Sequence, residues 1–173
     1  DRQISPMLAH AAEPFDSPDY LYEIKWDGTR CILFLTSDGL RLQNRRRVDI
    51  THRYPELGHL PAAVTETGVI LDGELVVLKG GKSDFRSLQQ REHLDDPLKI
   101  RLLSRRMPAT YVVFDILYRR GDRCTREPLQ RRKERLAEWL DGTVPGLLES
   151  QYIRKRGVHF FREAVDRSEE RRV

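Results

Sequence analysis

The sequence predicts an α+β fold in which antiparallel sheets are flanked by helices. Three observations support this prediction. Apolar strand-like runs are joined by short turns, helix-like segments fall between these hairpins rather than after every strand, and the chain is long enough for one domain with a real core, since 39% of its 173 residues are hydrophobic. We therefore expect a single domain spanning residues 1–173.

The first part of the chain contains the clearest hairpin. Three prolines predict an irregular lead-in over residues 1–19, and a period of two predicts a strand over residues 21–27. The nearly apolar residues 30–36 predict a second strand. Ser37-Asp38-Gly39 is a strong turn signal, so residues 40–43 are expected to return as the partner strand.

A second apolar run, residues 68–78, is interrupted by Asp72-Gly73-Glu74. Two interpretations remain open for it. It is either a hairpin with Asp72-Gly73 at the turn, or one continuous strand with a bulge. Two acids in a buried strand are costly unless they are paired or bound to a cation.

The other elements follow from local patterns. A helix opens near Pro55, and another, over residues 84–91, is capped by Ser83 or Asp84. Further along the chain we predict a surface loop with one helical turn at 92–108, strands at 110–118 and 146–153, and helices at 128–140 and 158–167. In the helix at 128–140 the leucines share one face, and the charged residues are expected outside: Arg131, Arg132, Lys133, Glu134 and Arg135.

The charge of the chain is biased toward arginine. Of 31 basic residues, 25 are Arg and six are Lys, and the formal net charge is +4. Arginine suits bidentate contact with phosphate, so a nucleotide or nucleic-acid partner is compatible; codon bias in a GC-rich genome explains the same excess. No apolar run approaches the ~18 residues of a membrane span and no signal pattern is seen, so we expect a cytoplasmic protein with no membrane partner.

The stretch from Tyr22 to Arg30 contains a lysine between two acids. On a strand, Glu23, Lys25 and Asp27 share one face. This pattern has two interpretations. It is either a solvated edge strand with compensating charges, or the site of a lysine nucleophile, whose amine attacks only when it is deprotonated. Arg30 is a candidate for the cation that disfavours the ammonium form.

Polar residues interrupt three of the predicted apolar strands. Lys25 accompanies Asp27, Asp72 accompanies Glu74, and Asp115 follows Phe114. One such residue is usually structural, whereas three strands that each carry one favour a common site.

In order along the chain, these segments resemble the adenylation domain of ATP-dependent DNA ligases, in particular the ligase modules of bacterial and archaeal end-joining proteins (ligase D type). The resemblance runs from about Pro6 to the C-terminus. It rests on Glu23-Ile24-Lys25-Trp26-Asp27-Gly28-Thr29-Arg30, Leu42-Gln43-Asn44-Arg45 with Asp49-Ile50-Thr51 and Arg53-Tyr54-Pro55-Glu56-Leu57, Leu71-Asp72-Gly73-Glu74-Leu75, Val113-Phe114-Asp115-Ile116-Leu117, and Pro128-Leu129 with Arg131-Arg132.

The resemblance implies an ATP-grasp-like nucleotidyltransferase fold and a role for each matching residue. Lys25 would attack the α-phosphorus of ATP, and the cofactor would be Mg²⁺ or Mn²⁺. Nucleotide contacts are implied for Glu23 with the adenine amino group, Phe114 with the purine ring, Arg30 and Arg45 with ribose or phosphate, and Glu74 with ribose or metal. Metal contacts are implied for Asp27, Glu74 and Glu170.

The sequence departs from the family pattern in two places. Where relatives have a metal-binding Glu-Gly pair, this chain has Glu170-Arg171, and it stops at Val173, before the lysine motif and the oligonucleotide-binding barrel of relatives. We therefore expect a C-terminally incomplete adenylation domain. Relatives also have Ser-Arg-Asn-Gly where this chain reads Asn44-Arg45-Arg46-Arg47, so only Arg45 carries over.

The resemblance predicts an enzyme that forms lysyl-AMP to seal nicked or broken double-stranded DNA, working with other end-joining domains or proteins. The resemblance does not predict that this chain seals DNA on its own. The alternatives are a non-catalytic nucleotide- or DNA-binding relic module and an RNA ligase or capping guanylyltransferase; Glu23, which suits adenine, disfavours the last.

Overall fold

The computed structural model describes residues 4–7, 10–140 and 142–167, which form two compact units. The larger unit comprises Asp1–Pro6 and Trp26–Glu149, and the smaller one Met7–Lys25 and Ser150–Val173. The sequence analysis predicted one domain. The structure instead contains two compact units, and each unit has its own sheet.

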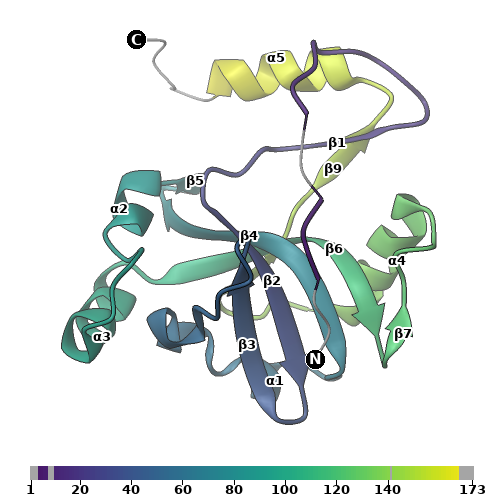
Figure 1. Ribbon diagram of the computed structural model, residues 1–173. Helices are drawn as coiled ribbons and strands as arrows, with labels where there is room; N and C mark the ends of the chain where they lie inside the picture. Colours follow the sequence, from purple (N-terminus) through teal and green to yellow (C-terminus); the bar gives the residue numbers. More distant parts are fainter. Residues whose placement is uncertain (1–3, 8–9, 141, 168–173) are drawn as a thin grey trace. The chain divides into compact units, whose positions relative to one another are not determined.

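The larger unit is built on a seven-stranded sheet in the order β3-β2-β4-β6-β7, with β5 paired to β4 and β8 paired to β6 (Figure 1). All pairings are antiparallel except that of β6 with β8. The predicted mixed fold with antiparallel sheets is confirmed. The strands are β2 Thr29–Thr36, β3 Gly39–Asn44, β4 Val69–Lys79, β5 Lys82–Ser83, β6 Ala109–Arg119, β7 Asp122–Arg123 and β8 Leu147–Glu149.

The hairpin of β2 and β3 forms where its turn signal predicts. Thr36 pairs with Gly39 across the turn, and Gly39 has a φ of 128°, which L side chains rarely adopt. Strand β2 is buried on both faces. Cys31, Leu33 and Leu35 pack into the main core, whereas Ile32 and Phe34 pack on the other side with Ile70 of β4 and Leu117 of β6.

Strands β4 and β6 form the centre of the sheet. Strand β4 is continuous through Asp72-Gly73-Glu74, which confirms the bulged strand and excludes the hairpin. The pairs Asp72–Asp115 and Gly73–Val113 leave Phe114 as an extra residue in β6. Leu117 is a second extra residue, between the pairs Leu71–Ile116 and Ile70–Tyr118. Each bulge bends the strand and redirects nearby side chains.

The helices of the larger unit differ from the predicted ones in two places. Near Pro55 the chain makes two 3₁₀ turns, η1 Thr51–Arg53 and η2 Pro55–Leu57, and a short helix α1 Leu60–Ala63, instead of the single helix predicted to open there. Within the predicted loop at 92–108 lies a ten-residue helix, α3 Pro97–Arg106. Asp96 caps it by accepting hydrogen bonds from the backbone N–H groups of Leu98 and Lys99. Helix α2 Phe85–Gln89 is capped by Asp84.

Helix α4 Leu129–Trp139 forms as predicted, but its charged side chains are not all outside. Leu136 and Trp139 enter the main core beside β6. Lys133 is only 1% exposed, and Arg132 is half-buried because it pairs with Asp115. The helical pattern alone does not separate these two cations from their exposed neighbours.

Arg91 connects three parts of the larger unit. Its guanidinium is 1% exposed and forms an ion pair with Glu56 of η2. It also donates to the backbone carbonyls of Met107, at 2.9 Å, and Arg53, at 2.7 Å. Glu56 in turn accepts from the backbone N–H of Ala109, at 2.7 Å, where β6 begins. This buried network fixes the 3₁₀ region against the start of the central strand.

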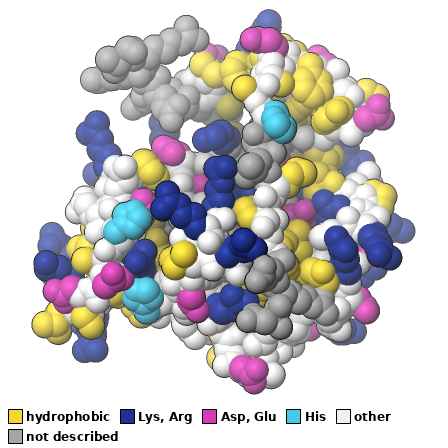
Figure 2. All heavy atoms as spheres, in the orientation of Figure 1, with side chains coloured by type: hydrophobic (Ala, Val, Ile, Leu, Met, Phe, Trp, Pro, Cys, Tyr) yellow, Lys and Arg dark blue, Asp and Glu magenta, His cyan; other side chains and the backbone are white. Residues whose placement is uncertain are grey.

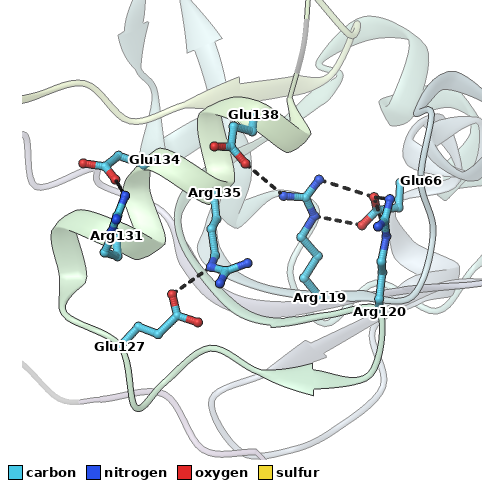
Figure 3. Close-up of polar contacts among 8 residues, drawn as sticks. All are labelled: Glu66, Arg119, Arg120, Glu127, Arg131, Glu134, Arg135 and Glu138. Carbon is cyan, nitrogen blue, oxygen red and sulfur yellow. Dashed lines mark hydrogen bonds and ion pairs between the residues drawn. The ribbon is translucent and has the colours of Figure 1, made fainter.

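A surface array of ion pairs joins α4 to the end of β6 (Figure 3). Glu66 accepts from Arg119 at 2.9 Å and from Arg120 at 2.8 Å, and Arg119 reaches Glu138 of α4 at 3.3 Å. The indole N–H of Trp139 donates to the backbone carbonyl of Glu66, at 2.9 Å. Glu66 is therefore bonded through both its side chain and its backbone.

The smaller unit has a two-stranded antiparallel sheet, β1 Leu21–Glu23 with β9 Tyr152–Arg154, and a helix, α5 Gly157–Arg167. The predicted strand at 21–27 is thus too long, because β1 ends at Glu23. The predicted strand at 146–153 is instead two strands, β8 in the larger unit and β9 in the smaller. The described part of the N-terminal lead-in is irregular, as predicted.

Charged side chains are spread across the surface. Figure 2 shows Lys and Arg in several places on one face, interspersed with Asp and Glu. Cys31 and Cys124 are both free thiols. No helix within the described residues is long and apolar enough to cross a membrane.

Candidate functional site

One well-ordered polar cluster of the larger unit is the ion pair of Arg30 with Asp72. Arg30 on β2 donates from Nε to Oδ1 of Asp72 at 2.6 Å and from its terminal nitrogen to Oδ2 at 2.8 Å, a bidentate geometry. The Asp72 side chain is 6% exposed. Burial raises the pKa of the Asp72 carboxyl, and the nearby Asp115 adds to that rise, while Arg30 opposes it.

Arg30 also contacts the Phe114 ring. Its guanidinium carbon lies 4.4 Å from the ring centroid, a cation–π distance. Glu74 is the β4 residue paired with Arg30 across the sheet. The structure therefore brings together three of the residues predicted for the site, namely Arg30, Glu74 and Phe114, on the three adjacent strands β2, β4 and β6.

Two glycines allow the strands to approach closely at this cluster. A Cβ on Gly28 would lie 2.1 Å from the backbone oxygen of Leu75, so only glycine fits beside β4. A Cβ on Gly73 would lie 2.6 Å from the ring of Tyr111. The Tyr111 hydroxyl is buried beneath, within donating distance of the backbone carbonyl of Cys31 at 2.9 Å.

A second bidentate ion pair lies beside the first. Arg132 of α4 donates to both carboxylate oxygens of Asp115, at 2.8 and 2.9 Å, and its third nitrogen donates to the backbone carbonyl of Glu127 at 2.6 Å. Asp115 is paired in register with Asp72, so two opposed carboxylates are each neutralised by a separate arginine. The sequence analysis predicted Arg132 on the solvent-exposed face of the helix. The signal for its buried ion pair was Asp115 in the preceding strand, because a half-buried carboxylate needs a cation.

Glu23 and Lys25 lie in the smaller unit. Glu23 is half-buried and is paired with Tyr152 of β9. Lys25 is exposed and lies outside any strand, so the prediction that Glu23, Lys25 and Asp27 share a strand face is wrong. Strand β1 ends at Glu23, where its pairing with β9 also ends.

Arg45 and Asp27 belong to the larger unit. Arg45 is exposed in the turn after β3, which Asn44 organises: its side-chain oxygen accepts from the backbone N–H groups of Arg46, at 2.9 Å, and Val48, at 3.0 Å. Arg47 has a φ of 64°, at the position where the family pattern has glycine. Asp27 is half-buried, and Glu170 lies outside the described residues.

The described carboxylates suit a metal site in which the substrate supplies part of the coordination. Within the part of the chain that the structure describes, no three His, Cys, Asp or Glu side chains are grouped to hold an ion. Mg²⁺ is commonly held by one or two carboxylates together with substrate phosphates and water. Single carboxylates such as Asp27 or Glu74 fit that donor set, whereas an all-protein cage is not formed by these residues.

Comparisons with known proteins give one consistent result. Residues 6–170 match the family model for the ATP dependent DNA ligase domain. DNA ligase C of Mycobacterium tuberculosis is 34% identical over 140 residues, which cover 81% of this chain and 38% of that protein. The bifunctional non-homologous end joining protein LigD of Bacillus subtilis is 34% identical over 141 residues, 78% of this chain and 23% of that protein.

A solved structure supports the same grouping. The mycobacterial DNA ligase D complexed with ATP and MES superposes with a TM-score of 0.77 and 26% identity, covering 94% of this chain and 50% of that one. Among the first relatives the chain spans between 38% and 57% of the relative's length. On these matches, the chain belongs to the family of ATP-dependent DNA ligase domains.

Proposed function

We propose that this chain is the adenylation domain of an ATP-dependent DNA ligase of the end-joining type, with Lys25 as the nucleophile. The Lys25 amine attacks the α-phosphorus of ATP, a P–N bond forms, the bond to the bridging oxygen breaks, and pyrophosphate leaves. The amine loses its proton in the process. The product is an enzyme–AMP phosphoramidate.

The observation that carries the proposal is the position of Arg30, which is held by Asp72 and lies over Phe114 in a chain that matches the ligase family over residues 6–170. A fixed cation beside an aromatic ring suits a nucleotide, whose phosphates and purine need those two groups. The Phe114 ring stacks on the purine. Glu23 accepts a hydrogen bond from the adenine amino group.

The remaining residues bind the charged parts of the substrates. Arg30, Arg45 and Glu74 contact ribose or phosphate. Asp27, Glu74 and Glu170 are the carboxylates that would hold Mg²⁺ or Mn²⁺, and such an ion, when bound, neutralises charge on the phosphates.

The acceptor that we propose is the 5′-phosphate of nicked or broken double-stranded DNA, in the cytoplasm and together with other end-joining domains. The support is similarity to a protein named for non-homologous end joining and to a ligase D structure. A basic chain, with a formal charge of +4, is compatible with a polyanionic partner.

Labelling with α-³²P-ATP and Mg²⁺ or Mn²⁺ tests the nucleophile. The parent chain is expected to become covalently labelled, and Lys25→Ala is expected to carry no label because the proposal makes the Lys25 amine the nucleophile. Lys99→Ala, which removes an exposed lysine on α3, is the matched control and is expected to label like the parent.

The other outcomes identify the alternatives. ATP binding without labelling of any variant would make the chain a nucleotide-binding module. Labelling from GTP in preference to ATP would favour a guanylyltransferase. A nick-sealing assay that compares DNA with RNA identifies the acceptor.

A further inference from the structure

The bulge in β6 that contains Phe114 is held from one side by α4. Phe114 is the extra residue between two register pairs, Val113 with Gly73 and Asp115 with Asp72. Such a residue has no partner in β4 to fix its orientation, so its side chain depends on what holds the bulge itself. The next residue, Asp115, provides that attachment through Arg132.

The attachment is rigid. All three guanidinium nitrogens of Arg132 are used, two on the Asp115 carboxylate and one on the backbone carbonyl of Glu127, just before α4 begins. Both partners are 16% exposed. Screening by water is therefore weaker than for a surface pair, and the planar guanidinium fixes orientation as well as distance.

The pair also separates two like charges. Asp115 is opposed in register to Asp72, which is the residue that holds Arg30, and Arg30 lies over Phe114. If Arg132 were lost, the Asp115 carboxylate would face Asp72 without its cation. Repulsion from Asp72 would then push the Asp115 carboxylate away, and because Asp115 follows Phe114 in the bulge, this movement turns the Phe114 ring.

From this geometry we propose that Asp115 and Arg132 are positioning residues that set the orientation of Phe114 and thereby the affinity for the nucleotide base. The inference rests on the proposed function, because it uses Phe114 as the purine-stacking residue. It assigns a role to the second arginine of the Arg131-Arg132 pair, while Arg131 is paired with Glu134 on the surface.

A double-mutant cycle tests the proposal, with binding measured calorimetrically for ATP and for inorganic tripolyphosphate. Phe114→Ala is expected to weaken ATP binding by between about fivefold and a hundredfold, the usual range for loss of one base–aromatic stack. Arg132→Met is expected to weaken ATP binding at least about threefold and to leave tripolyphosphate unchanged, because only the base is affected. In the Phe114→Ala background, Arg132→Met should have no further effect on ATP.

Arg131→Met is the matched control, since it removes the neighbouring, exposed arginine and should bind both ligands like the parent. If Arg132→Met unfolds the chain, the isosteric Asp115→Asn replaces it in the cycle with the same expected pattern. Losses that multiply in the double mutant, or equal losses for tripolyphosphate, would overturn the positioning role. If Phe114→Ala binds ATP normally, the stacking role falls as well, while labelling of Lys25 still decides whether the chain is a nucleotidyltransferase.

Discussion

Gly28 shows how a single residue of the Lys-x-Asp-Gly stretch is required by packing. An alanine Cβ there would lie 2.1 Å from the backbone oxygen of Leu75 and 2.9 Å from the Glu74 side chain. A backbone oxygen cannot rotate away as a flexible side chain can. Substitution must therefore move β4 or the segment that leads into β2, and both carry residues of the candidate site.

We expect Gly28→Ala to lower the free energy of unfolding by about 1–3 kcal/mol, the usual cost of overpacking. Chemical denaturation provides the measurement. Gly58→Ala is the comparison, because Gly58 has a φ of −62° and its added Cβ would lie 3.1 Å from the Pro55 backbone oxygen, a tight contact that a shift of a few tenths of an ångström relieves, so a smaller loss than for Gly28→Ala is expected. Equal stability of the two variants would mean that β4 shifts at little cost.

The sequence predicted candidate residues for the site, and their surroundings only in part. Resemblance named Arg30, Glu74 and Phe114, and all three lie on adjacent strands. That Arg30 is bonded to Asp72 could not be read from the chain, because the two are brought together only by the register of β2 with β4. Lys25 was assigned to a strand by its period, yet the strand ends two residues earlier.

At the scale of elements, the array around Glu66 shows how α4 is held to the sheet (Figure 3). Hydrogen bonding to Arg119 is the main cause that lowers the pKa of Glu66, and it outweighs burial, which acts in the opposite direction. A carboxyl whose pKa is lower in the folded state stabilises the fold above its unfolded pKa, whose ordinary value is 4.5. That stability is lost as the pH falls through the folded pKa.

Glu66→Gln is expected to lower the free energy of unfolding at pH 7 by about 1 kcal/mol, because Arg119 and Arg120 lose a charged acceptor. Below pH 4.5 the difference between the variant and the parent should narrow as the pH falls. Glu138→Gln is the control, since Glu138 is 68% exposed and contacts only one of these arginines, at 3.3 Å. Denaturant titrations at several pH values measure both, and a difference that persists unchanged at pH 3 would contradict the charge-based explanation.

Elements were predictable where the signal is local. The β2–β3 turn and the apolar runs of β4 and β6 carry their own patterns, and so does α4. Helix α3 was missed because its leucines and charges mix without a clear stripe, and Leu98 and Leu102 are exposed. The sequence Asp96-Pro97 was the available signal, since an N-cap acid followed by proline marks a helix start.

At the scale of the whole molecule, the fold class was predictable and the division into two units was not. Hairpins form between neighbouring segments, so their order indicates antiparallel sheets. The smaller unit instead depends on β1 pairing with β9, near opposite ends of the chain. A pairing over that separation leaves no local trace, and the predicted strand at 146–153 accordingly combined one strand from each unit.

The two units should differ in stability. Strands β1 and β9 have three residues each and form a sheet of only two strands, supported by α5 and by aromatic contacts of Phe15 with Tyr20 and Tyr22 at 5.0 and 5.7 Å. Two-stranded sheets are marginal in water. The central strands β2, β4 and β6 instead contribute many of the buried side chains of the main core. Native-state amide exchange should therefore be faster in β1 and β9 than in β4 and β6, because the smaller unit opens without global unfolding.

Denaturant dependence separates local opening from global unfolding in the same experiment. The exchange rates of the Tyr22 and Ile153 amides, which are paired in register, should depend only weakly on denaturant concentration. The exchange rates of the Leu71 and Val113 amides should instead follow the global unfolding transition. Phe15→Ala, which removes the aromatic contacts, should speed exchange in β1 and β9 and leave β4 unchanged. If all four amides instead exchanged with the same free energy of opening, the two units would unfold as a single cooperative body, and the small sheet would be supported by more than its own contacts.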